Sequence, residues 1–163
     1  MEETDAVFAH LQELVDELPE MEALGARIDA ARAARDAVDA DARRVGQVNQ
    51  EARVRSYYDE HMAAREAAVA AGDAEAELAA REAALQCGNM LAIRKGARED
   101  AERRLQEALS AGDFASVEEA RDALLPPEEL EGEIARLRAY QRDYADTLQR
   151  ARELEECATC ATV

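Results

Sequence analysis

The feature that most constrains the fold of this chain is the spacing of apolar residues in its last third. Residues there advance in alternating steps of four and three: Leu130, Ile134, Leu137, Gln141, Tyr144, Leu148 and Ala151. Positions spaced in this way form the narrow a/d stripe of a coiled-coil helix. Such a stripe must pack against another helix, because alone it would remain exposed to water.

A second stripe with the same spacing lies near the start of the chain, and only Arg35 interrupts it. Its members are Met21, Leu24, Ile28, Ala31, Arg35, Val38, Ala42 and Val45. We expect the two stripes to form helix–helix interfaces, either within the chain or with a partner. The expected interface residues are Met21, Leu24, Ile28, Val38, Val45, Leu130, Ile134, Leu137, Tyr144 and Leu148.

The composition supports long helices. Hydrophobic residues make up 48% of the chain, but alanine dominates them and tryptophan is absent. Alanine buries little area, so a thick globular core is not expected, whereas its helix propensity is the highest of all residues. Disorder is the alternative for a chain with 35% charged residues, but the regular apolar spacing favours helices.

Glycine and proline divide the chain into segments. Gly72-Asp73 and Gly112-Asp113 are each expected to end one helix in the same manner, with glycine at C′ and aspartate at the following N-cap. Ser116 to Glu119 fits a capping box, and Pro126-Pro127 closes a short helix and opens the last one. The predicted segments are residues 1–71, 72–111, 112–156 and a cysteine-containing tail, 157–163.

Within these segments, Pro19 predicts a local break or a new helix start, and Cys87-Gly88-Asn89 could interrupt the second helix. That helix has a poorer stripe, built on Leu78, Leu85, Leu91, Ala101, Leu105 and Leu109. Helices joined by short turns fold back as antiparallel neighbours. The predicted fold class is therefore all-α, with long helices in an antiparallel coiled-coil hairpin or thin helical bundle, which a second copy could complete.

The charge excludes several functions. With a formal net charge of −17 and a single lysine, Lys95, the surface repels phosphates, so we expect no direct binding of nucleic acid. No apolar run approaches the roughly 20 residues that span a bilayer, and the first residues lack a secretion signal. Three cysteines without a disulfide-dense pattern fit a reducing compartment. We expect a cytoplasmic protein without membrane contact.

Cys157 and Cys160 form the one pattern with metal-ligand spacing. Tetrahedral zinc needs four ligands, so a closed site would require a second chain, and the alternative is two ordinary thiols on the tail. The sequence contains no ATPase, nuclease, metalloprotease or dinucleotide-binding motif. We therefore expect a protein that is not an enzyme and has no cofactor of its own, zinc apart.

Residues 97–156 are expected to form, in order, a helix, a turn with Phe114, a short capped helix, the acidic opening Pro126 to Leu130 and a long heptad run. In this order they resemble the coiled-coil arm of SbcC-type proteins, the SMC-like ATPase subunits of bacterial DNA-repair exonucleases. The resemblance implies a structural role in tethering, with an SbcD-like nuclease as partner within a larger assembly. The chain departs from the family in lacking ATPase motifs, and its terminal cysteines do not match the family's zinc hook in position or in proline.

Two other interpretations remain open. Leu18 to Met21 and the Gly72-Asp73 turn faintly resemble YlbF-like regulators, which implies a small acidic adaptor that assembles with protein partners and holds a metal through its C-terminal cysteines. The other is a coiled-coil protein that associates with itself without a metal. A metal assay under reducing conditions separates these two.

Overall fold

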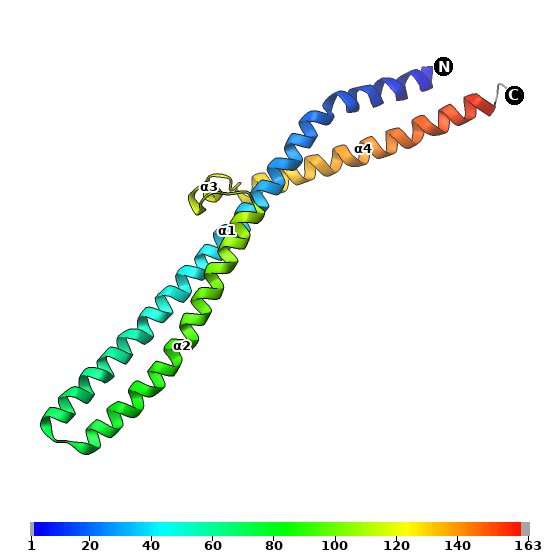
Figure 1. The fold of residues 1–163 in the computed structure, drawn as a ribbon. Helices are drawn as coiled ribbons and strands as arrows, with labels where there is room; N and C mark the ends of the chain where they lie inside the picture. The colour runs from blue at the N-terminus through cyan, green and yellow to red at the C-terminus, as the bar shows by residue number, and fades with distance from the viewer. Residues whose placement is uncertain (1, 161–163) are drawn as a thin grey trace. The chain divides into compact units, whose positions relative to one another are not determined.

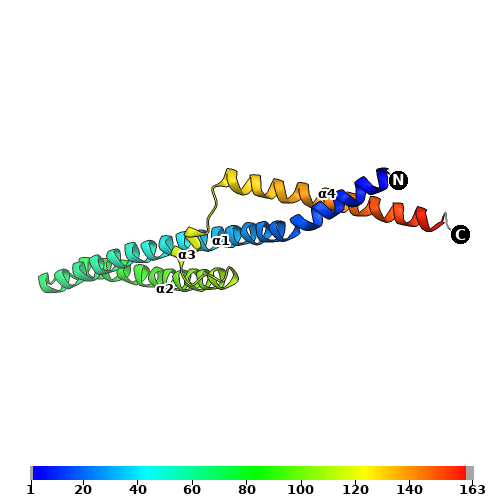
Figure 2. The same cartoon turned by 90° about the horizontal axis from the view of Figure 1, so that it is seen from above.

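The computed structural model describes the backbone of residues 2–160 and the side chains of residues 4–157. In that part of the chain it contains four helices and no strand: α1 (Glu2–Ala71), α2 (Ala74–Ala111), α3 (Val117–Asp122) and α4 (Pro127–Cys160). Figure 1 shows α1 and α2 joined by a tight turn, and Figure 2 shows them again side by side. The predicted all-α fold with long antiparallel helices is confirmed.

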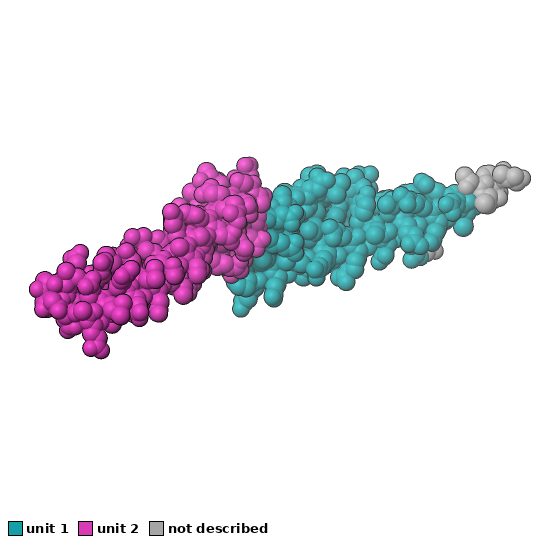
Figure 3. Space-filling view, turned by 60° about the horizontal axis from the view of Figure 1, so that its bottom comes forward, with its two compact units in different colours: residues 1–32, 123–163 teal, residues 33–122 magenta. Residues whose placement is uncertain are grey.

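The chain divides into two compact units, coloured separately in Figure 3. Unit 1 consists of residues 1–32 and 123–163, and unit 2 of residues 33–122. The units do not follow the helix boundaries, because α1 contributes its first part to unit 1 and the remainder to unit 2. Each unit therefore pairs one portion of α1 with a different helix.

In unit 1, α4 lies antiparallel to the first part of α1. Three ion pairs show the direction: as the residue number rises along α1, the number of the partner on α4 falls. The pairs are His10–Asp143, Glu20–Arg136 and Arg27–Glu133. Between the helices, Met21, Leu24 and Ile28 form a buried cluster. The partly buried residues that pack against it are Leu130, Ile134, Leu137 and Tyr140. The two predicted stripes thus meet each other in this unit.

Pro19 does not break α1, which continues through it. The ribbon bends in the blue part of α1 that contains this residue (Figure 1). Proline removes one backbone hydrogen bond and its ring crowds the preceding turn, so a bend at this place has a local cause. The expected break is therefore a bend within one helix.

In unit 2, α2 lies antiparallel to the second part of α1, but the buried residues differ from those expected. After Ala31 the buried positions are Ala34, Ala37 and Asp41, each one residue before the expected Arg35, Val38 and Ala42. Arg35 and Ala42 are exposed, Val38 is half-buried, and Val45 is 42% exposed. Within the chain, the buried face of α1 shifts by one residue from Arg35 onward, because a three-residue step at Ala34 turns alanines inward and keeps the guanidinium in water. The role of Val38 and Val45 at an interface with a partner stays a prediction.

The stripe expected on α2 is also split. Ala101, Leu105 and Leu109 are buried, whereas Leu78 and Leu85 are 55% and 66% exposed. Leu78 and Leu91 are separated by 13 positions, which corresponds to a rotation of about 220° on a helix with 3.6 residues per turn. They cannot share one face, so the six residues expected to form one stripe belong to two.

The turn at Gly72 has the expected geometry. Gly72 has a φ of 72°, and the backbone N–H of Asp73 donates to the carbonyl of Ala68 at 3.0 Å. Asp73 then caps α2, because its Oδ1 accepts from the backbone N–H of Ala76 at 3.0 Å. These contacts form a Schellman motif followed by an N-cap.

The turn after α2 uses the same hydrogen-bond pattern but shifts it by one residue. Phe114 N–H donates to the carbonyl of Leu109 at 3.0 Å, and Asp113, not Gly112, has the positive φ, 55°. Gly112 is needed for space, since a Cβ there would overlap the Phe114 ring and lie 3.1 Å from the Cβ of Ala33. The expectation that both turns end their helices in the same manner is therefore wrong in this detail.

The capping box that opens α3 is confirmed in the Ser116 half, whereas Glu119 reaches back to the residue before the N-cap. The backbone N–H of Glu119 donates to Ser116 Oγ at 3.1 Å, and Glu119 Oε2 accepts from Ala115 N–H at 2.7 Å. From α3, Arg121 Nη2 reaches Asp41 Oδ2 at 3.0 Å, and Arg44 Nη2 contacts the other oxygen at 2.8 Å. The buried carboxylate of Asp41 thereby holds α3 against α1.

Candidate interaction surfaces

Most of the expected interface residues are already in contact within the chain. Met21, Leu24 and Ile28 are at most 8% exposed, and α4 covers them with Leu130, Ile134 and Leu137. Tyr144 and Leu148 are half-buried, and the Tyr144 ring stacks on Tyr140 with centroids 6.0 Å apart. The hydroxyl of Tyr140 donates to the carbonyl of Leu14 at 2.7 Å, and burial raises the pKa of this hydroxyl.

A different surface, on the outer side of α2, is mostly uncovered by the part of the chain that the structure describes. It comprises Leu78, Leu85 and Ile93, which are 55%, 66% and 64% exposed. Steps of seven and eight residues keep the three side chains within an arc of roughly 80°. We call these three residues the outer face of α2. The outer face could have been predicted from the sequence, because helical spacing places Leu78 and Leu85 on a different side of α2 from Leu91 and Leu105.

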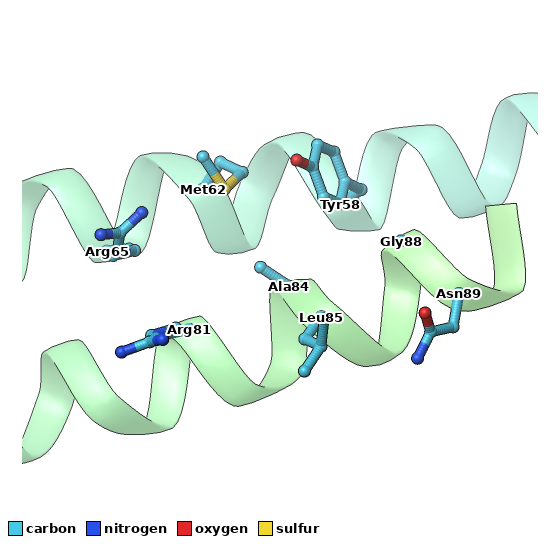
Figure 4. A pocket seen from close by; sticks show the side chains of 8 residues that line it. All are labelled: Tyr58, Met62, Arg65, Arg81, Ala84, Leu85, Gly88 and Asn89. Atoms are coloured by element: carbon cyan, nitrogen blue, oxygen red, sulfur yellow. The ribbon is translucent and has the colours of Figure 1, made fainter. Parts of the chain in front are cut away.

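A groove of about 370 Å³ lies between α1 and α2 next to the outer face. Its lining comprises Tyr58, Met62, Arg65, Arg81, Ala84, Leu85, Gly88 and Asn89. Figure 4 shows Arg65 and Arg81 on facing helices at one end, with Tyr58, Gly88 and Asn89 toward the other. We call it the Tyr58 groove. Sequence reasoning missed it, because it depends on which side of each helix faces the other.

Glycine leaves this groove open. A Cβ on Gly88 would lie 3.6 Å from Cε2 of Tyr58, which is an ordinary contact distance. Helical packing therefore does not require a glycine here, and α2 continues through Cys87 to Asn89 without the break that these residues suggested. Glycine inside a helix costs about 0.5–1 kcal/mol relative to alanine.

Polar contacts also join α1 and α2 in the middle of unit 2. Arg98 Nε donates to Glu51 Oε2 at 2.8 Å, and Arg98 Nη1 donates to Glu102 at 2.7 Å. The hydrogen bond from Arg98 lowers the pKa of Glu51, and the one to Glu51 raises that of Arg98. Because these side chains neutralise each other, they offer no unpaired charge to a ligand.

Cys157 and Cys160 were expected on a tail after the last helix, but α4 extends to Cys160. Cys157 is an exposed free thiol, whereas the side chain of Cys160 lies outside the described residues. A shared zinc site thus stays a prediction. Within the residues described, no three His, Cys, Asp or Glu side chains come together in a way that could hold a metal ion.

No helix in the described ranges has both the length and the apolar character that crossing a bilayer requires. Comparison with the profiles of known protein families, with curated proteins and with solved structures finds no match for this chain.

Proposed function

We propose that this chain is a non-catalytic helical module that tethers or joins proteins, in the manner of the coiled-coil arms of SbcC-type exonuclease subunits, which residues 97–156 resemble. The observation that carries the proposal is the outer face of α2, where three large aliphatic side chains are more than half exposed. An apolar stripe of this kind on a helix fits the stripe of a second helix.

The expected strength of this contact follows from its area. Burying a fully exposed leucine or isoleucine side chain contributes about 1.5–3 kcal/mol, so three that are half exposed contribute roughly 1–2 kcal/mol each. Association itself costs an estimated 4 kcal/mol or more. The outer face alone therefore supports weak pairing, and a stable complex needs further contacts nearby.

A photo-cross-linking experiment tests the proposal. A benzophenone amino acid replaces Leu85 in the full chain, and its adducts in the source cells are compared with those of the same amino acid at Val48, which is exposed on α1. We expect defined protein adducts from position 85 only. An adduct of twice the chain's mass identifies a second copy as the partner, and any other mass identifies a different protein.

The matched variant carries Leu78→Ser and Ile93→Ser with the probe still at position 85. Both residues are exposed, so these changes should alter the free energy of unfolding by no more than about 0.5 kcal/mol each. The adducts should disappear while the thermal unfolding curve stays in place. Equal adducts from positions 85 and 48, or adducts that survive both serines, would show that the outer face is not the association surface.

A further inference from the structure

The Tyr58 groove carries positive charge in a strongly acidic chain. Arg65 and Arg81 both line it, although the formal net charge of the protein is −17. Arg81 forms no ion pair or hydrogen bond within the described part of the chain. The Nε of Arg65 is buried and lacks a hydrogen-bond partner among the described residues, and its nearest carboxylate oxygen, on Glu77, is 3.8 Å away.

The rest of the lining is suited to an apolar group. Met62, Ala84 and Leu85 supply aliphatic surface and Tyr58 an aromatic ring. A groove that is apolar along its walls and offers unsatisfied guanidinium N–H groups at one end matches a ligand with the opposite arrangement. Guanidinium groups bind carboxylates through paired, charge-assisted hydrogen bonds, which are about twice as strong as neutral ones.

We propose that the Tyr58 groove binds a carboxylate-bearing, amphipathic segment of a partner protein, with an aliphatic side chain against Tyr58 and Met62 and a Glu or Asp carboxylate at Arg65 and Arg81. The proposal rests on the proposed function, since Leu85 belongs to both the groove and the outer face of α2. A helix that docks on the outer face therefore reaches the groove, and the groove supplies the additional contacts that the outer face lacks.

The negative net charge of the protein does not prevent a carboxylate from binding in the groove. Charges farther away than the Debye length, about 8 Å at physiological ionic strength, are largely screened. Glu77 contacts Arg65 at the limit of an ion pair, with side chains 41% and 38% exposed, and such exposed pairs are worth at most about 1 kcal/mol. An incoming carboxylate competes with a weak partner at Arg65 and with none at Arg81.

NMR titration of the full chain tests the proposal with two synthetic helical peptides. Both are alanine-based with capped ends and carry one leucine; four residues later one has glutamate and the other lysine. We expect the glutamate peptide to shift the amide signals of Gly88 and Asn89 and to bind at least five times more tightly than the lysine peptide. Arg81→Glu should remove this preference, whereas Arg53→Glu, an equal charge change outside the groove, should retain it.

Gly88→Ala provides a second variant, and its added Cβ would meet Tyr58 only at an ordinary contact distance of 3.6 Å. It should raise the melting temperature, because alanine is the better helix former. It should also weaken the binding of the glutamate peptide. The proposal is overturned if both peptides bind equally, if neither binds, or if Arg81→Glu and Arg53→Glu act alike. If it fails while Leu78→Ser and Ile93→Ser still abolish cross-linking, association through the outer face stands without the groove.

Discussion

The two units pack one helix, α1, in two different ways. In unit 1 large side chains, Met21, Leu24 and Ile28, are buried against the aliphatic stripe of α4. In unit 2 the buried residues of α1 are small, Ala34 and Ala37, followed by the carboxylate of Asp41. On α2, Leu105 and Leu109 are buried, whereas Leu78, Leu85 and Ile93 remain on its outside.

This contrast separates two uses of apolar residues. The stripe of unit 1 is buried between α1 and α4 and stabilises the fold. The outer face of α2 is more than half exposed and stabilises it less. Exposed aliphatic side chains on an already paired helix are available to another protein. Unit 2 therefore carries both proposed binding features, the outer face and the Tyr58 groove.

The largest expected effect is in unit 1. Ile28 is 2% exposed within the aliphatic cluster, so Ile28→Ala should lower the free energy of unfolding by about 2–4 kcal/mol. Urea unfolding followed by circular dichroism measures it. Leu18→Ala is the control, since Leu18 is 37% exposed on the same helix and should cost less than half as much. Equal losses would mean that the cluster does not dominate this unit.

In unit 2 we expect a larger side chain, not a smaller one, to destabilise the helix pair. Ala37 is fully buried, so Ala37→Leu should overpack the interface and cost about 1–3 kcal/mol. Ala42 is exposed, and the same change there should be close to neutral. If Ala42→Leu is the costly variant, the register predicted from the sequence is the correct one, and the contrast between the units disappears.

These registers mark the limit of what the sequence predicts. The start of α2 and the cap of α3 were predictable, because Asp73 and Ser116 act on backbone groups within three residues of themselves. The choice between Ala34 and Arg35, or between the two faces of α2, depends on the opposing helix. Alanine fits a buried and an exposed position equally well, so its spacing does not fix a register.

The two helix ends should differ in their response to glycine. Asp113 has a positive φ, a conformation that glycine adopts without steric cost, so Asp113→Gly should raise the free energy of unfolding by about 0.5–1 kcal/mol. Gly72→Ala should lower it by a similar amount, because Gly72 has a φ of 72°. A gain from both changes, or a loss from both, contradicts the assignment of the two turns. Thermal unfolding of the two variants measures this.

The smallest effect concerns pH in unit 1. Hydrogen bonds to Asp143 and then to Glu13 raise the pKa of His10 above 6.5, with Nε2 3.2 Å from Asp143. Thr147 also donates to this carboxylate, at 3.3 Å. The stabilisation is complete below the unfolded pKa and is lost as the pH rises through the folded one. His10→Gln should therefore lower the melting temperature slightly near pH 5.5 and leave it unchanged above about pH 8.5. A difference that grows with pH would contradict this sign.

Thiol accessibility tests the central claim most directly, namely that α1 buries alanines in unit 2 while Leu78, Leu85 and Ile93 of α2 stay exposed. Single cysteines replace Ala34, Ala37, Leu78 or Leu85 in a chain whose own cysteines, Cys87, Cys157 and Cys160, are changed to serine. Their rates of reaction with a maleimide are then compared under native conditions. The account predicts slow labelling at positions 34 and 37 and fast labelling at 78 and 85. Fast labelling at 34 and 37 with protection at 78 and 85 would contradict it.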